Sequence, residues 1–131
     1  MRTDGFRRVI AVLVATGLAC FAATVHAKPS GNWRIAFNHA TDNDGAIVFR
    51  VAPIDGQPSD IEVKVPANTS ENNVAELVRD SLKASLGSDN YRIGVDDGED
   101  VVIKKRGKTK KFELTMVSTT LTGLNIKINH N

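Results

Sequence analysis

The chain has 131 residues, 41% of them hydrophobic and 24% charged, which is a length for one domain. Its 17 basic and 15 acidic side chains leave a net charge of only +2, so the charge of the whole molecule does not predict polyanion binding and only local clusters remain to be considered. A single cysteine excludes a disulfide within the chain, so a packed core must stabilise the fold.

Residues 1–27 have the three parts of a secretory signal peptide. A start with three arginines precedes the apolar run 9–23, and Val25 and Ala27 occupy the −3 and −1 positions of a cleavage site before Lys28. The apolar run has about 15 residues, fewer than the roughly 20 that span a bilayer. The sequence therefore predicts a protein of the bacterial periplasm or the exterior, with no membrane span after cleavage.

Two alternatives to cleavage before Lys28 stay open. In the first alternative the N-terminal segment is retained as a membrane anchor. In the second, Cys20 is lipidated. A lipoprotein signal usually has a Leu-like residue three positions before its cysteine, and here that position is Gly17. With cleavage before Lys28, the mature domain 28–131 has no cysteine and carries 14 basic and 14 acidic side chains, because residues 1–27 contain three of the former and one of the latter.

Alternating apolar residues predict three strands before residue 66. Their buried faces would carry Trp33, Ile35 and Phe37, then Ile47, Phe49 and Val51, and then Ile61, Val63 and Val65. Residues 42–45, Asp-Asn-Asp-Gly, separate the first two strands, and Asp or Asn before Gly is typical of a hairpin turn. Residues 53–58 contain two prolines and a glycine and predict a second turn.

One amphipathic helix is predicted next. Residues 67–70 offer capping side chains for its N-terminus, and Gly87 can end it in a left-handed conformation. Its apolar residues recur at spacings of three and four, at Val74, Leu77, Val78, Leu82 and Leu86.

Alternation resumes after the helix and predicts four more strands. Their apolar positions are Tyr91, Ile93 and Val95; Val101 and Ile103; Phe112, Leu114 and Met116; and Leu124, Ile126 and Ile128. Residues 96–100 predict a hairpin turn, 104–111 a basic hairpin loop and 119–123 a further turn. The order βββαββββ predicts an α+β fold: one antiparallel meandering sheet of six to seven strands, with the helix on one face. Whether the first hairpin shares that sheet, and which strands form its edges, stays open.

The stretch from Ile61 to Met116 combines a Val-rich strand (61–65), a capped helix (69–86), a hairpin (91–104) and a further strand (112–116). In this pattern it resembles small β-α-β modules of bacteriophage tail proteins and other secreted bacterial proteins. The resemblance implies a structural or protein-interaction role rather than catalysis.

Neither aspartate-glycine turn fits a calcium loop. With Gly45 or Gly98 at position 6 of an EF-hand, position 1 would be Ala40 or Ile93, which have no side-chain oxygen. We therefore expect no bound metal or cofactor. A weak surface cation site stays open only at the acidic cluster Asp96, Asp97, Glu99 and Asp100.

The basic loop is the sharpest local feature of the sequence. It carries the candidate anion-binding residues Lys104, Lys105, Arg106, Lys108, Lys110 and Lys111. Phosphate or sulfate groups would be attracted to it. Aromatic residues that would stack on bases are absent from the loop, which disfavours nucleic acid. The alternative is a solvated loop that discourages aggregation of strand edges.

Catalytic groupings are scarce in residues 28–131. His39 and His130 are their only histidines, and neither has the spacing of a zinc site or of a catalytic triad. We therefore predict an exported, non-catalytic protein-interaction or structural domain with a protein partner in the envelope. The first alternative is a binder of anionic envelope polymers through residues 104–111. The second is a small hydrolase or lyase, which would have to bring His39 close to carboxylates distant in sequence.

Overall fold

The computed structural model describes residues 28–130. The described part of the chain forms seven strands and one helix, in the predicted order. They are β1 (Asn32–Asn38), β2 (Gly45–Pro53), β3 (Ser59–Val65), α2 (Glu71–Leu86), β4 (Tyr91–Asp96), β5 (Asp100–Lys105), β6 (Phe112–Thr119) and β7 (Asn125–His130). The predicted signal peptide, with Cys20, lies outside these residues.

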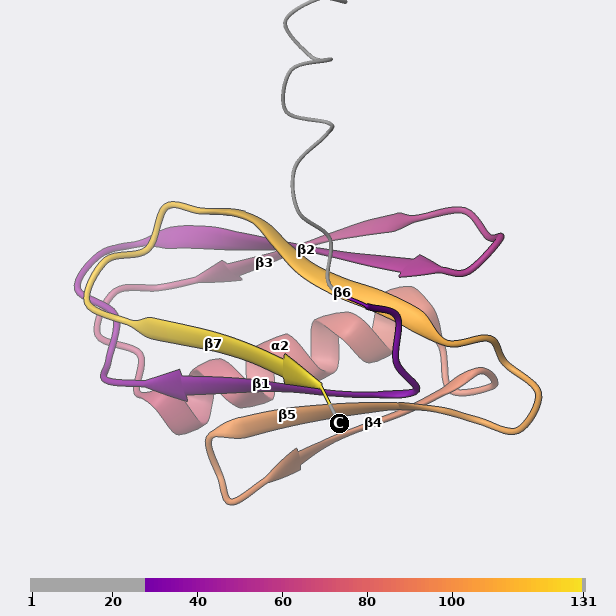
Figure 1. The fold of residues 1–131 in the computed structure, drawn as a ribbon. Helices are drawn as coiled ribbons and strands as arrows, with labels where there is room; N and C mark the ends of the chain where they lie inside the picture. Colours follow the sequence, from indigo (N-terminus) through magenta and orange to yellow (C-terminus); the bar gives the residue numbers. More distant parts are fainter. Residues whose placement is uncertain (1–27, 131) are drawn as a thin grey trace, which may run out of the picture.

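The strands form two antiparallel sheets, so the fold is α+β as predicted, but the prediction of one meandering sheet is wrong. One sheet has the order β4-β5-β1-β7 and the other has the order β3-β2-β6. Figure 1 shows the two sheets as separate layers, with α2 along one side. The strands predicted to form the first hairpin therefore lie in different sheets, because β1 pairs with β5 and β7, whereas β2 pairs with β3 and β6.

Residues 42–45 cross between the sheets instead of forming a hairpin turn, because their polar groups bind other connections. The Asp44 carboxylate accepts a hydrogen bond from the Ala67 backbone N–H at 2.8 Å. The Asn43 side chain accepts from the Thr122 N–H and donates to the Thr120 carbonyl, at 2.8 and 3.0 Å. Asp and Asn therefore fasten this crossover to the segments before α2 and after β6.

The connections on either side of β6 also cross between the sheets. The basic segment after β5 leads from the four-stranded to the three-stranded sheet, so it is not the predicted hairpin loop. The two predicted turns at 53–58 and 96–100 do join hairpins, because β2 pairs with β3 and β4 pairs with β5.

The core lies between the two sheets and α2, and it confirms most of the predicted apolar faces. The strand residues predicted to be buried before residue 66 are all at most 4% exposed. In α2, the buried residues are Val74, Ala75, Val78 and Leu82, while Leu77 and Leu86 pack partly buried against the core. The Ser70 side chain caps the helix by accepting from the Asn73 N–H, and Gly87 follows its last turn with φ = 75°.

The side of the molecule formed by the edge strands β6 and β7, which we call the open side, is not covered by α2. The helix packs against β1, β3, β4 and β5, whereas β6 and β7 each pair with only one strand of the described chain. Met116, an apolar position of the predicted strand, is 38% exposed, and its neighbour Val117 lies at a β-bulge and is 47% exposed. These two apolar side chains are therefore only partly covered by the described residues.

Trp33 connects the two sheets at the start of β1. Its indole Nε1 donates a buried hydrogen bond of 2.8 Å to the carbonyl oxygen of Phe112, the first residue of β6. Ser30 also pairs with Phe112 through two backbone hydrogen bonds, so the Phe112 carbonyl accepts twice. The His130 ring lies 4.8 Å from the Trp33 ring, which places the end of β7 at the same junction.

Candidate anion-binding site

The outer face of the four-stranded sheet carries a row of basic side chains at one end. Arg92 of β4 lies directly opposite Lys104 of β5, and Lys104 lies opposite Asn32 of β1. Directly opposite residues have Cβ atoms about 4.5–5.5 Å apart, and like charges there are destabilising. Neither Arg92 nor Lys104 has a carboxylate within salt-bridge distance in the described part of the chain. Their charges are therefore available to an external anion.

A hollow of about 280 Å³ adjoins this row and is lined by Arg92, Lys104, Lys105, Arg106 and Gly107. Arg106 is held in place by two hydrogen bonds: its backbone N–H donates to the Asn90 carbonyl at 2.8 Å, and its Nε donates to the Tyr91 carbonyl at 3.3 Å. A guanidinium fixed in this way loses little conformational entropy when it binds an anion. Four cationic residues thus surround one small hollow.

The Tyr91 ring, at the start of β4, packs in the core next to the site. It is 6% exposed, lies edge-on to the Phe112 ring with centroids 5.1 Å apart, and burial raises the pKa of its hydroxyl. Tyr91 is therefore neutral at physiological pH and contributes packing rather than charge. Its backbone carbonyl is the group that orients Arg106.

The six predicted anion-binding residues do not form one cluster. Lys104, Lys105 and Arg106 line the hollow, whereas Lys108, Lys110 and Lys111 are exposed on the crossover segment that follows. The Nζ of Lys105 donates to the Gly107 carbonyl at 3.1 Å, which partly engages its charge. Sequence reasoning missed Arg92, because only the register between β4 and β5 places it beside Lys104.

Two of the four carboxylates in the acidic cluster at the other end of the same strands are paired with an arginine. Arg34 of β1 forms ion pairs with Asp96 at 2.7 Å and with Asp100 at 2.6 Å, and these hydrogen bonds raise the pKa of Arg34. Asp97 belongs to the β4–β5 turn, where it adopts φ = 54°. The described residues contain no group of three side chains that could hold a metal ion. Asp96 and Asp100 therefore serve as partners of Arg34.

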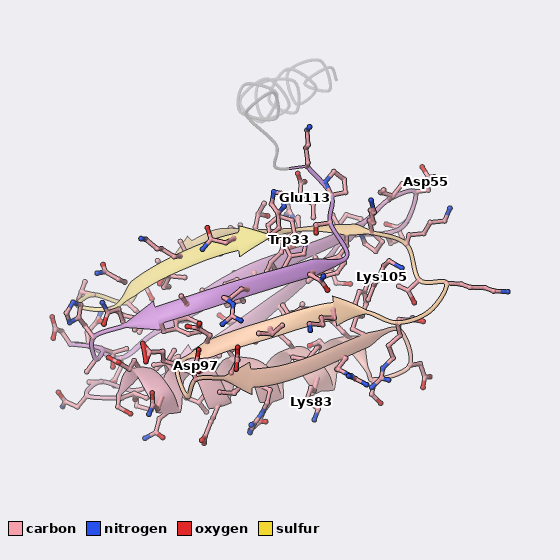
Figure 2. The ribbon with its side chains drawn as sticks, turned by 60° about the horizontal axis from the view of Figure 1, so that its bottom comes forward. Trp33, Asp55, Lys83, Asp97, Lys105 and Glu113 are labelled. Carbon is pink, nitrogen blue, oxygen red and sulfur yellow. The ribbon has the colours of Figure 1, made fainter. Side chains whose placement is uncertain are left out.

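The outer face of the sheet thus has opposite charges at its two ends. Figure 2 shows Asp97 at the hairpin end of β4 and β5, and Lys105 at the opposite end of these strands. Each strand is six residues long, which at about 3.4 Å per residue separates the two ends by about 17 Å. An anion approaching this face is attracted to the Arg92–Lys104 end and repelled from the turn.

The two histidines lie in separate places. His39 is exposed, has φ = 71°, and its backbone N–H donates to Glu71 Oε1 at 2.9 Å. His130 is exposed on β7 beside Trp33. The structure therefore does not bring the two imidazoles together.

Neither a protein-family model nor a curated protein matches this chain. The resemblance to bacteriophage tail modules accordingly stays a prediction. Within residues 28–130, no helix is both long and apolar enough to cross a membrane.

Proposed function

We propose that this protein is an exported, non-catalytic binding domain that attaches to an anionic polymer of the bacterial envelope. The observation that carries the proposal is the Arg92–Lys104 row, which pairs with no carboxylate of residues 28–130, beside a hollow that is also lined by Arg106. Repulsion between two cations at directly opposite strand positions lowers the stability of the free protein. A bound phosphate or sulfate would relieve this repulsion, because it neutralises both charges at once.

Export and the charge distribution support the same proposal. The signal-peptide pattern of residues 1–27 predicts that the domain meets envelope polymers. Because the predicted mature domain has equal numbers of acidic and basic residues, its attraction to an anion comes from the local separation of charge and not from net charge. The crossover lysines Lys108, Lys110 and Lys111 extend the positive end and would contact further anionic groups of a polymer.

The proposal is tested by the salt concentration at which the purified protein elutes from heparin and from immobilised lipopolysaccharide. Arg92→Gln combined with Lys104→Gln removes two charges from the row, and Lys64→Gln combined with Lys83→Gln removes two exposed charges elsewhere. Arg106 is left intact because it also holds the β5–β6 crossover to β4. We expect the first variant to elute at clearly lower salt than the wild type and the control to elute unchanged.

Equal elution of both variants would refute the proposed site, because retention would then depend on charge number and not on position. Failure of the wild type to bind either resin would refute the proposed function. Removal of the Arg92–Lys104 repulsion should leave thermal stability equal or slightly higher. A loss of retention in the first variant therefore cannot be attributed to unfolding if its thermal transition is unchanged.

A second candidate function, binding of an envelope protein, is supported by the open side of the molecule. Met116 and Val117 on β6 are exposed there, and β7 has one edge without a partner strand among the described residues. An extended segment of a partner protein would add to β7 as a further strand.

Capture of a partner from an envelope extract should be abolished by Met116→Lys combined with Val117→Lys. It should survive Ile54→Lys, which changes a large exposed apolar residue elsewhere, on the β2–β3 turn. Equal capture by both variants would refute this candidate.

A further inference from the structure

Gly94, in the middle of β4, is a glycine that the backbone does not require. It is not among the glycines with positive φ, and a Cβ built on it would meet no atom within 4 Å. Glycine in a strand interior lowers stability relative to alanine. Such a glycine often marks a place where a ligand or another backbone approaches closely. The empty space next to Gly94 is therefore a candidate binding site for a ligand.

Gly94 lies in a hollow of about 350 Å³ on the outer face of the four-stranded sheet. The register places Gly94 opposite Val102, Val102 opposite Arg34, and Arg34 opposite Asn129, so these four residues form one row across the sheet. This row is adjacent to the Arg92–Lys104 row, and both basic residues line this hollow as well as the smaller one. Gly94 and Val102, which have no or small side chains, form the floor of this hollow, and the Arg92–Lys104 row lies on one side of the floor.

The polar groups around the floor both donate and accept hydrogen bonds. Asn32 and Asn129 contribute amides to the lining, and Arg34 and Asp96 contribute a donor and an acceptor that already bind each other at 2.7 Å. Hydroxyl groups match such a mixed lining, because a hydroxyl also donates and accepts. The volume is near the lower end of the range for small-molecule sites, which suits one ring-sized unit.

From these observations we infer that the hollow binds a single sugar unit that carries a phosphate group. The phosphate contacts Arg92 and Lys104, and the sugar ring lies over Gly94 and Val102 with its hydroxyls towards Asn32, Asn129 and Arg34. The phosphate part of this inference rests on the proposed function, because it uses the same Arg92–Lys104 row. The sugar part is new and names the chemical class of the ligand. The same unit can be a free sugar phosphate or a phosphorylated sugar at the surface of an envelope polymer, and the experiment distinguishes the two.

The decisive variant is Gly94→Val, which fills the floor without changing any charge. Ala52→Val is its matched control, because Ala52 is a partly exposed residue of β2 in the other sheet. Binding of glucose 1-phosphate, of inorganic phosphate and of glucose to each protein is measured by titration calorimetry, and retention on immobilised lipopolysaccharide is measured in parallel. We expect the wild type and Ala52→Val to bind glucose 1-phosphate at least tenfold more tightly than inorganic phosphate. Gly94→Val should lose this preference, keep its weak phosphate binding, and melt at the same or a higher temperature.

Each outcome has one consequence. If Gly94→Val binds glucose 1-phosphate as tightly as the wild type, the sugar site is refuted while the anion site stands. If the wild type binds inorganic phosphate and glucose 1-phosphate equally, the inference is likewise refuted. If retention on lipopolysaccharide falls together with sugar-phosphate binding in Gly94→Val, the polymer is the source of the bound unit, whereas unchanged retention assigns the hollow to a free sugar phosphate. Val102→Phe fills the same floor from β5 and replaces Gly94→Val if that variant does not fold.

Discussion

Replacing Trp33 with Phe tests the connection between the two sheets. The Trp33 side chain is 2% exposed, and its Nε1 donates to the Phe112 carbonyl at 2.8 Å. Trp33→Phe removes this donor, but the carbonyl keeps its second hydrogen bond, from the Ser30 N–H at 2.9 Å. The acceptor is therefore not left without a partner, and the loss is limited to the net value of one buried hydrogen bond, about 0.5–1.5 kcal/mol.

The smaller ring adds a packing loss to this value. Phenylalanine is about 40 Å³ smaller than tryptophan, and an unfilled cavity at about 24 cal/mol per Å³ contributes about 1 kcal/mol. The expected decrease in the free energy of unfolding is therefore about 1.5–2.5 kcal/mol. This is a measurable part of the stability of a domain of this size, which is of the order of 5–15 kcal/mol.

Urea unfolding followed by far-UV circular dichroism measures this decrease, because the signal does not depend on the tryptophan. Phe37→Leu is the matched control: Phe37 lies on the same face of β1, is 1% exposed, and loses volume without losing a hydrogen bond. We expect Trp33→Phe to lower the free energy of unfolding by about 1 kcal/mol more than Phe37→Leu does. An equal or smaller decrease would show that the indole hydrogen bond does not stabilise the junction.

Two further substitutions test local features of the fold. Ser70→Ala removes the side chain that caps α2 and should lower the free energy of unfolding by about 1 kcal/mol, measured by thermal or urea denaturation; an unchanged midpoint would contradict the capping role. Asp60→Asn removes the ion pair with Arg50, whose hydrogen bond lowers the pKa of Asp60. Because a carboxyl with a lowered pKa stabilises the fold above its unfolded pKa of about 3.9, the substitution should cost a few tenths of a kcal/mol at pH 7. The difference from the wild type should shrink as the pH falls below about 3.9 and disappear once the pH is below the lowered pKa of Asp60; a difference that persists when both forms are protonated would show that another interaction was lost.

Secondary structure could be predicted from the sequence because its causes are local. Alternation of apolar residues located the strands, and the capping residues with Gly87 located the helix, since these patterns depend on neighbours a few positions away. Pairing depends on distant residues, so only the hairpins β2–β3 and β4–β5 were predicted correctly, whereas the β1–β2 hairpin, the hairpin at the basic loop and the single sheet were wrong. Residues 42–45 have the composition of a hairpin turn, but their side chains bind Ala67 and the segment 120–122 instead.

The candidate site was predictable only in part for the same reason. The basic run marked Lys104 and Arg106, because clustered charge is visible along the chain. Arg92 lies 12 positions before Lys104 and is indistinguishable in sequence from any exposed strand arginine. Arg34 likewise has no local signal for its role, since it reaches Asp96 and Asp100 only through the pairing of β1 with β5 and of β5 with β4.

Two features that lower the stability of the free protein share one face of the sheet. Arg92 and Lys104 are like charges at opposite positions, and Gly94 is a strand glycine that neither backbone conformation nor packing requires. Either feature alone would be unremarkable on a solvated surface. They are, however, two residues apart on β4 and line the same hollow. Sequences depart from local rules mainly where binding or catalysis requires it. This coincidence is the reason why we propose a binding site on the outer face of the four-stranded sheet rather than on the exposed lysines of the crossover, although those lysines are the more prominent feature of the sequence.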